Sequence, residues 1–201
     1  MTVAKCRLFV ATTGLETADR AAGLLAAALA EGDAASVLVK AGTRQREIAE
    51  AMLPPARARG VALLVEQDAD LAAELGADGL QMTAGVADLA AARRTLGSDA
   101  ILGVDCGSSR HAAMSVGEAG ADYVGFSGVR RDADGGSIVA WWANLFEVPC
   151  VALDELTEVE ARRMVLDGAD FVTPPRTIWE SEAAAAQMVR SFNSMFDECT
   201  R

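Results

Sequence analysis

The chain has 201 residues, 51% of them hydrophobic, and its formal net charge is −11. This composition suits one domain with a large apolar core and excludes a wholly disordered chain. Because nucleic-acid and anionic-membrane surfaces need clustered Lys and Arg, we expect neither partner. No apolar run approaches the roughly 18 residues of a membrane span, no signal peptide precedes Lys5, and the four cysteines are scattered, so we expect a cytoplasmic protein with reduced thiols.

Short apolar runs alternate with Ala-rich amphipathic segments along the whole chain. The runs are typical of strands that are covered on both faces, and they are residues 6–11, 37–39, 61–65, 79–82, 101–104, 123–126, 148–153 and 171–172. The segments between them carry capping residues and helical periodicity, and they are residues 16–30, 43–53, 68–75, 86–96, 108–119, 138–146, 157–166 and 181–197. Pro54 and Pro55 predict a break or kink at the end of the second helix.

The tripeptide Gly-Ala-Asp occurs three times, each time between a predicted helix and a predicted strand. The copies, at residues 76–78, 120–122 and 168–170, lie 44 and 48 residues apart. That spacing suits two strand–helix units of about 20–25 residues each. Eight alternations without a linker predict a single domain over residues 1–201, an α/β protein folded as a (β/α)8 TIM barrel. A doubly wound open sheet is the alternative, although no G-x-G-x-x-G motif follows the first strand.

In such barrels the active site is built by the loops after the carboxyl ends of the strands. We therefore predict that ligands bind to the polar residues at these ends, which are Lys40, Glu66, Gln67, Asp105, Ser127, Arg130, Arg131, Asp154 and Thr173. Glu66, together with Asp68, offers carboxylate oxygens suited to Mg²⁺. Asp154-Glu155 and Pro174-Pro175 follow the last two strands, and they argue against a preformed phosphate site there, because carboxylates repel anions and prolines lack amide donors.

Several of these residues also have a purely structural interpretation. Asp154 can be a solvated residue near a helix N-terminus, where negative charge is favourable. Arg130 and Arg131 can form an exposed surface pair. Trp141 and Trp142 predict core packing and an interface more than a platform for a ligand.

The ordered set of segments resembles the thiamine-phosphate synthase/TenI superfamily of β/α barrels. The similar segments are residues 63–72, 75–82, 100–104, 119–126, 148–153 and 168–170, and the resemblance extends from Leu8 to Ile178. It implies an enzyme that joins hydroxymethylpyrimidine diphosphate to a thiazole phosphate and releases pyrophosphate. It also implies Mg²⁺ as cofactor and small phosphorylated molecules as partners, and it allows a homo-oligomer.

The residues that hold ligands in that superfamily are largely replaced in this chain. A Gln-x-Arg-x-Lys pattern after strand two aligns with Val37, Val39 and Ala41, and an Asn-Asp pair after strand three aligns with Glu66 and Gln67. Val86 stands where the superfamily has a metal-binding Asp, Asp105 where it has a Ser, and Gly107 where the TenI-type isomerases have a His. After strand seven, Asp154-Glu155 stands in place of Gly-Gly. The Thr-x-Thr-Lys loop after strand six is absent, and Arg130 to Asp132 lie near its position.

These replacements predict a diverged member without the standard synthase activity, which binds a ligand, regulates, or performs an altered small-molecule reaction. The first alternative is an active thiamine-phosphate synthase in which the two loop arginines replace the diphosphate loop and Glu66 or Asp68 holds Mg²⁺. The second alternative is a protein-interaction module that uses the outer helices with Trp141 and Trp142.

Overall fold

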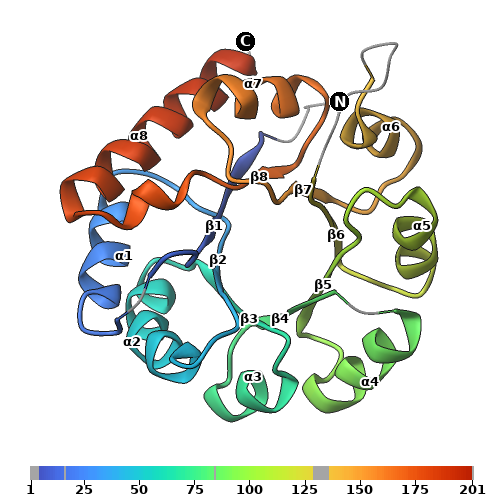
Figure 1. The fold of residues 1–201 in the computed structure, drawn as a ribbon, viewed down its shortest axis with the longest axis horizontal. Coiled ribbons are helices and arrows are strands. Elements are labelled where there is room, and N and C mark those ends of the chain that lie inside the picture. The colour runs from blue at the N-terminus through green and yellow to red at the C-terminus, as the bar shows by residue number, and fades with distance from the viewer. Residues whose placement is uncertain (1–4, 16, 84, 129–135, 201) are drawn as a thin grey trace.

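A computed structural model describes residues 5–15, 17–83, 85–128 and 136–200, within which eight parallel strands alternate with eight α-helices (Figure 1). The strands are β1 (Arg7–Ala11), β2 (Ser36–Val39), β3 (Ala62–Glu66), β4 (Gly79–Met82), β5 (Ile101–Asp105), β6 (Tyr123–Phe126), β7 (Cys150–Ala152) and β8 (Phe171–Val172). The helices are α1 (Ala21–Ala30), α2 (Gln45–Ala58), α3 (Ala69–Leu75), α4 (Val86–Leu96), α5 (Arg110–Glu118), α6 (Ile138–Leu145), α7 (Glu158–Leu166) and α8 (Glu182–Cys199). A 3₁₀ helix, η1 (Arg176–Trp179), lies between β8 and α8.

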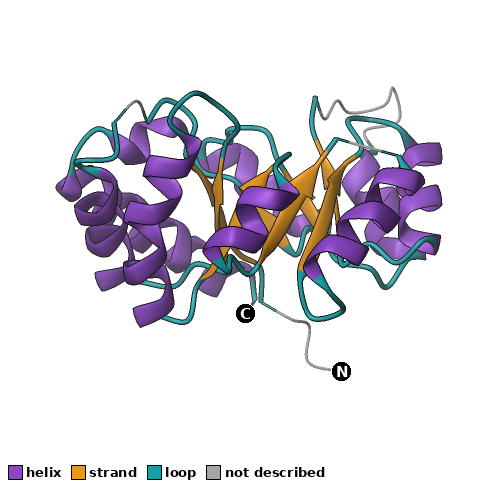
Figure 2. Cartoon of the chain, turned by 90° about the horizontal axis from the view of Figure 1, so that it is seen from below, coloured by secondary structure: helices purple, strands orange, loops and turns teal. Residues whose placement is uncertain are grey.

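Each strand pairs with its neighbours in sequence, and β8 returns to β1 to close the barrel. The closing pairs are Arg7 with Phe171 and Leu8 with Val172. Figure 2 shows the strands at the centre with the helices outside them. The predicted (β/α)8 barrel is therefore confirmed. Among the described helices, none is long and apolar enough to cross a membrane.

The strands alternate between an outer face under the helices and an inner face inside the barrel. In β2, Val37 and Val39 belong to the large apolar cluster that joins strands to helices. Leu38, which lies between them, packs inside the barrel with Leu64 and Tyr123. A polar residue two positions after Leu38 or Leu64 therefore points into the carboxyl-terminal mouth of the barrel.

The repeated Gly-Ala-Asp segment is a structural clip at the amino ends of the strands. In each copy the Asp carboxylate accepts a hydrogen bond of 2.8 Å from the N–H at the start of the preceding strand; the pairs are Asp78 with Leu63, Asp122 with Leu102, and Asp170 with Cys150. The glycine of each copy has a positive φ, which ends the helix before it. The repeat thus sets strand pairing at the end of the barrel opposite to the mouth.

Two features of the helices differ from the sequence prediction. Of the predicted break or kink at Pro54 and Pro55, the break is wrong, because α2 continues through both prolines to Ala58; the kink stays a prediction. Leu53 and Ala56 are buried on either side of the prolines, and this packing holds the last turn although two amide donors are missing. The helix η1 was not predicted, and its Trp179 is anchored by a 2.8 Å hydrogen bond from Nε1 to the carbonyl oxygen of Ala11.

The tryptophan pair of α6 is mainly part of the core. Trp142 is 1% exposed, donates from Nε1 to the carbonyl oxygen of Val148 at 2.7 Å, and stacks on Phe146 with 4.1 Å between ring centroids. Trp141 is half-buried, and the guanidinium group of Arg110 lies 4.9 Å from its ring centroid. The predicted core role is confirmed for Trp142. Of the two tryptophans, only Trp141 is partly accessible to solvent.

Candidate active site

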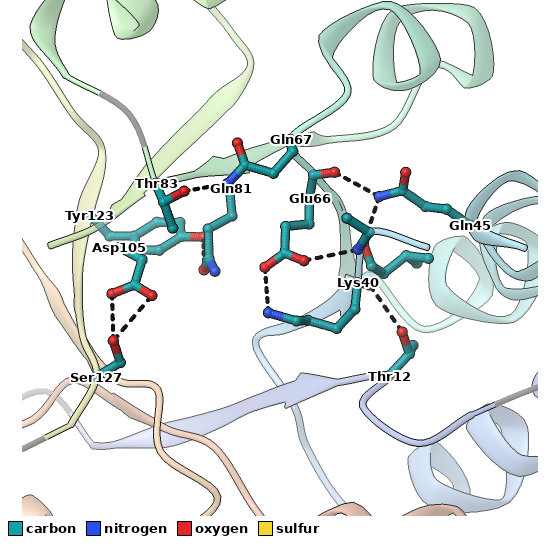
Figure 3. Close-up of polar contacts among 12 residues, drawn as sticks. Thr12, Lys40, Gln45, Glu66, Gln67, Gln81, Thr83, Asp105, Tyr123 and Ser127 are labelled. Atoms are coloured by element: carbon teal, nitrogen blue, oxygen red, sulfur yellow. Dashed lines mark hydrogen bonds and ion pairs between the residues drawn. The ribbon is translucent and has the colours of Figure 1, made fainter. Parts of the chain in front are cut away.

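An ion pair between Lys40 and Glu66 lies at the mouth of the barrel (Figure 3). Lys40 follows β2 and Glu66 ends β3, each two residues after an inward-facing leucine, so both side chains enter the mouth. The Lys40 ammonium group contacts Glu66 Oε1, and the N–H of Ala41 donates to Oε2 at 2.8 Å. The Glu66 side chain is 11% exposed and that of Lys40 is 39% exposed. The buried carboxylate is therefore compensated, and the cation is held at a fixed place with one side open to a ligand.

Three further hydrogen bonds fix the loops around this ion pair. Gln45, at the start of α2, donates from Nε2 to the carbonyl oxygens of Glu66 at 2.7 Å and Val39 at 3.2 Å. Thr12 Oγ1 accepts a hydrogen bond of 3.0 Å from the backbone N–H of Lys40. The ends of β1, β2 and β3 are thereby tied together on one side of the mouth.

A hollow of about 420 Å³ opens beside Lys40, between the loops that follow β1 and β2. Its wall includes the cationic side chains Lys40 and Arg44 and the hydroxyl groups of Thr12, Thr13 and Thr43. Cations and hydroxyl donors are the groups that bind phosphate oxygens. The hollow therefore suits part of a phosphorylated ligand, although the net charge of the chain is negative.

Asp105 and Ser127 form a second polar pair across the mouth, at the ends of β5 and β6 (Figure 3). Ser127 Oγ donates to Asp105 Oδ1 at 2.9 Å and lies 3.2 Å from Oδ2. The N–H of Gly107 also donates to Oδ1, at 2.9 Å. These contacts hold the Asp105 carboxylate in one orientation, directed toward Ser127, on the other side of the mouth from Lys40 and Glu66 (Figure 3).

Gln81 and Tyr123 lie between these two pairs, and sequence analysis missed both of them as site residues. Gln81 is 1% exposed on the inner face of β4, and its Oε1 accepts a hydrogen bond of 2.9 Å from the Tyr123 hydroxyl. Gly103 makes room for the tyrosine ring, because a Cβ at that position would lie 1.8 Å from Tyr123 Cζ. Burial, and then the charges of Glu66 and Asp105, raise the pKa of Tyr123 well above its usual range, so the hydroxyl stays protonated.

Gln67 adopts a backbone conformation that is rare for a residue other than glycine, with φ of +65°. Its N–H donates to the carbonyl oxygen of Gln81 at 2.9 Å, and its Nε2 donates to Thr83 Oγ1 at 2.7 Å. Such backbone strain clusters at functional sites, where surrounding contacts maintain it. The predicted residue Gln67 is thus placed on the exposed rim of the mouth and tied to β4.

The remaining predicted residues follow β6, β7 and β8. Asp154 is half-buried and accepts a hydrogen bond of 2.9 Å from the N–H of Gly128. Thr173 is 2% exposed, and its Oγ1 is fully buried without a partner among the described residues. Arg130 and Arg131 lie outside the described residues.

The Glu155 carboxylate accepts hydrogen bonds from Arg176, the first residue of η1. Its Oε2 accepts hydrogen bonds from Arg176, at 2.9 Å from Nε and 3.3 Å from the backbone nitrogen. A carboxylate thus lies where many TIM barrels bind a phosphate. The lack of a preformed phosphate site after the last two strands stays a prediction.

The structure shows which residues of strand two can face a ligand in the barrel. Val37 and Val39 are fully buried under the helices, so neither of them faces a ligand in the barrel. The inner face of this strand carries Ser36, Leu38 and then Lys40. Lys40 thus lies on the strand face that can reach a ligand in the barrel, whereas Val37 and Val39 do not.

The described carboxylates do not fit a magnesium site built from protein ligands alone. Across residues 5–15, 17–83, 85–128 and 136–200, no three Asp, Glu, His or Cys side chains come together. Both oxygens of Glu66 accept from Lys40 or Ala41, and Asp68 caps α3 by accepting from the N–H of Leu71 at 2.8 Å. The structure thus gives the two predicted metal ligands other roles.

Comparison with known proteins gives one consistent result. A family model described as thiamine monophosphate synthase matches residues 8–178. The thiamine-phosphate synthase of Rhodospirillum centenum is 38% identical over an alignment 200 residues long, which covers 94% of this chain and 96% of that protein. The thiamine-phosphate synthase of Chromobacterium violaceum is 34% identical over an alignment 187 residues long, which covers 88% of this chain and 89% of that protein.

Among solved structures, a thiamine phosphate pyrophosphorylase from Pyrococcus furiosus superposes with a TM-score of 0.78 and covers 98% of both chains. Its 22% sequence identity supports the fold alone. The sequence relatives overturn the expectation of a barrel without the standard synthase activity, because proteins 34–38% identical over most of the chain carry the name of the synthase. They favour the alternative of an active enzyme.

Proposed function

The chain belongs to the thiamine monophosphate synthase family, and from this premise we propose that it is a working thiamine-phosphate synthase. The proposed substrates are hydroxymethylpyrimidine diphosphate and a thiazole phosphate, and the products are thiamine phosphate and pyrophosphate. A bond from the thiazole nitrogen to the pyrimidine methylene carbon forms, while the bond from that carbon to the diphosphate oxygen breaks. The electron pair of the broken bond leaves with pyrophosphate.

The observation that carries this proposal is the 38% identity to the Rhodospirillum centenum synthase over 94% of the chain. Similarity along the whole length supports a shared activity more strongly than a shared fold, since TIM barrels host many reactions. Because the family's ligand residues are largely replaced, other residues of this chain must bind the substrates and stabilise the leaving group.

Lys40 is the residue that we propose to stabilise the departing pyrophosphate. It is one of only two lysines in the chain, and it lies at the mouth beside the hollow that also contains Arg44. A fixed cation next to the leaving group lowers the energy of the transition state because negative charge develops there. Glu66 keeps the ammonium group in place, and the three threonine hydroxyls beside it are available to phosphate oxygens.

We include Mg²⁺ in the proposal as the cofactor, because the thiamine-phosphate synthase resemblance implies it. When bound, it would offset the charge of the diphosphate, and it would take most of its ligands from the diphosphate oxygens and from water, as Mg²⁺ usually does in phosphate-binding enzymes. No step assigned here to a side chain depends on the ion.

The proposal is tested by incubating the purified chain with both substrates and Mg²⁺ and by following the release of pyrophosphate. Lys40→Met is compared with Lys5→Met, because Lys5 precedes β1 at the opposite end of the barrel and pairs there with Asp197. We expect turnover by the wild type and by Lys5→Met, and a loss of at least about tenfold in Lys40→Met. No turnover by the wild-type protein would refute the proposal.

A further inference from the structure

We propose that Gln81 binds the pyrimidine ring of the substrate, with its Nε2 donating a hydrogen bond to an acceptor atom of that ring, and that Tyr123 fixes the orientation of the amide. This inference rests on the proposed function and deepens it, since it names the residue that recognises the pyrimidine substrate. It is carried by the position of Gln81, by an unused donor, and by the hydrogen bond with Tyr123.

Gln81 occupies the centre of the mouth. Figure 3 shows its side chain between the Lys40–Glu66 pair and the Asp105–Ser127 pair, with Tyr123 beside it. The residue is 1% exposed, so a ligand that reaches it must enter the barrel. A buried amide requires partners for its donors as well as for its oxygen.

The donor side of this amide is unused. Within the described part of the chain, Oε1 accepts from Tyr123, and no acceptor pairs with Nε2. Thr173 Oγ1 is the one unpaired side-chain atom of the described residues that is fully buried. The unpaired nitrogen of Gln81 is not among the fully buried atoms, so it keeps a small accessible area through which a ligand in the mouth could accept its hydrogen bond.

Tyr123 determines which end of the amide faces the ligand. Its hydroxyl stays protonated in the interior and donates to Gln81, so the amide oxygen is turned toward the tyrosine. Reversing the amide would break this hydrogen bond, and the tyrosine hydroxyl would then accept from Nε2 and need another acceptor for its own proton. The mouth therefore presents N–H, and the matching ligand atom is an acceptor.

The neighbouring residues narrow the class of ligand further. Asp105 faces the same space as an acceptor whose orientation is fixed by Ser127 and Gly107. A neutral ring that carries an acceptor nitrogen and an amino donor matches Gln81 and Asp105 together. An aminopyrimidine has both groups, whereas a thiazole ring offers no N–H donor. The inference therefore assigns Gln81 to the pyrimidine substrate.

The test uses variants that alter the donor while keeping the shape of the site. Gln81→Glu keeps the oxygen near Tyr123 and removes the N–H donor, and Gln81→Met removes it without adding a carboxyl group beside Glu66 and Asp105. Tyr123→Phe frees the amide to rotate. Gln187→Glu is the matched control, because Gln187 is exposed on α8, outside the barrel.

Two quantities are measured for each variant: the KM of each substrate, and the affinity for hydroxymethylpyrimidine diphosphate alone by calorimetry. We expect pyrimidine binding to weaken about tenfold in both Gln81 variants and about threefold in Tyr123→Phe, with the KM of the thiazole phosphate and the kcat changed less than twofold. The control should match the wild type. If Gln81 had a merely structural role, the variants would instead weaken the binding of both substrates to a similar extent.

Unchanged affinity for the pyrimidine substrate in both Gln81 variants would overturn the inference, and so would an equal loss for the two substrates. If the wild type binds the pyrimidine substrate but does not turn over, the proposed function fails while the binding data still decide the role of Gln81. If the wild type turns over both substrates and the Gln81 variants bind the pyrimidine substrate as tightly as the wild type does, the proposed function stands and the inference fails. A wild type that neither binds nor turns over contradicts both.

Discussion

Lys40 and Glu66 form an ion pair that joins the ends of β2 and β3 at the mouth of the barrel. The carboxylate is 11% exposed and has its second oxygen on the N–H of Ala41, so it depends on the ammonium group for compensation. The ammonium group is more exposed and faces the hollow beside it. One contact thus stabilises the strand ends and orients the cation on which the proposed chemistry relies.

Replacing Lys40 by Met should lower both stability and activity. The variant leaves the Glu66 carboxylate poorly compensated, so we expect the free energy of unfolding to fall by on the order of 2 kcal/mol, as measured by urea denaturation. The double variant Lys40→Met/Glu66→Gln removes the unpaired charge and should regain most of that stability. It should not regain turnover, and a double variant with wild-type activity would contradict the role given to Lys40.

The single tyrosine of the chain provides a direct probe of the mouth. Because the pKa of Tyr123 is raised, the folded protein keeps this proton at pH values where the unfolded chain loses it. The free energy of unfolding should therefore be insensitive to this group below about pH 10 and should fall as the pH rises above that value. Ultraviolet titration should show tyrosinate only together with unfolding. Titration near pH 10 in the folded protein would contradict the described burial.

Replacing Gly103 by Ala should displace the tyrosine ring. The new methyl group would lie 1.8 Å from Tyr123 Cζ, a distance that the structure must relieve by moving the ring. We expect a loss of about 1–3 kcal/mol in stability by thermal or urea denaturation, together with weaker binding of the pyrimidine substrate. Gly85→Ala is the control, because a Cβ there meets no atom within 4 Å. Equal stability of the two variants would contradict the packing described for Tyr123.

The thiols should differ sharply in their reactivity. Cys6, Cys106 and Cys150 are buried, and Cys199 is half-buried on α8. Burial, and then the charge of Asp105, raise the pKa of Cys106 to about 12, which disfavours the thiolate. A disulfide reagent near pH 8 should therefore modify one thiol per native chain, Cys199, and four after denaturation. Rapid modification of Cys106 would show that the mouth is more open than the structure indicates.

The fold could be predicted from the sequence because its signals are local and repeated. Apolar runs such as residues 61–65 identify strands that are covered on both faces. The Gly-Ala-Asp copies recur because the same backbone clip is made at Asp78, Asp122 and Asp170. The ends of elements were less predictable, as in α2, where burial of Leu53 and Ala56 overrides the local effect of two prolines.

The site could be predicted only in part, because its geometry depends on contacts between distant strands. The structure places the predicted residues Lys40, Glu66, Asp105 and Ser127 at the mouth, since polar residues directly after strands are a clear signal of that position, while their role as ligands stays a prediction. Gln81 was missed because it stands inside a strand that was treated as core. The available signal was that Gln81 alternates with the buried residues Leu80 and Met82, which places it on the inner face of β4. No local pattern could show that Gly103 admits the ring that reaches this amide.

The function was harder to infer than the fold, because comparison of single motif positions depends on their exact alignment. In strand two, the compared positions Val37 and Val39 are buried under the helices, whereas Lys40 lies on the inner face. Counting replaced residues was therefore not a sufficient ground for expecting a loss of the synthase activity, and the relatives named as synthases contradict that expectation. The inner face of a strand, which only the structure establishes, is the correct frame for such a comparison.

The most direct test of the account is the identity of the product formed by the purified wild-type chain. Hydroxymethylpyrimidine diphosphate, the thiazole phosphate and Mg²⁺ are incubated with catalytic amounts of protein, and thiamine phosphate is quantified by mass spectrometry alongside pyrophosphate. The account predicts equal amounts of the two products over many turnovers, with Lys40→Met strongly impaired and Lys5→Met unaffected. Absence of thiamine phosphate, or pyrophosphate release without it, would contradict the central claim.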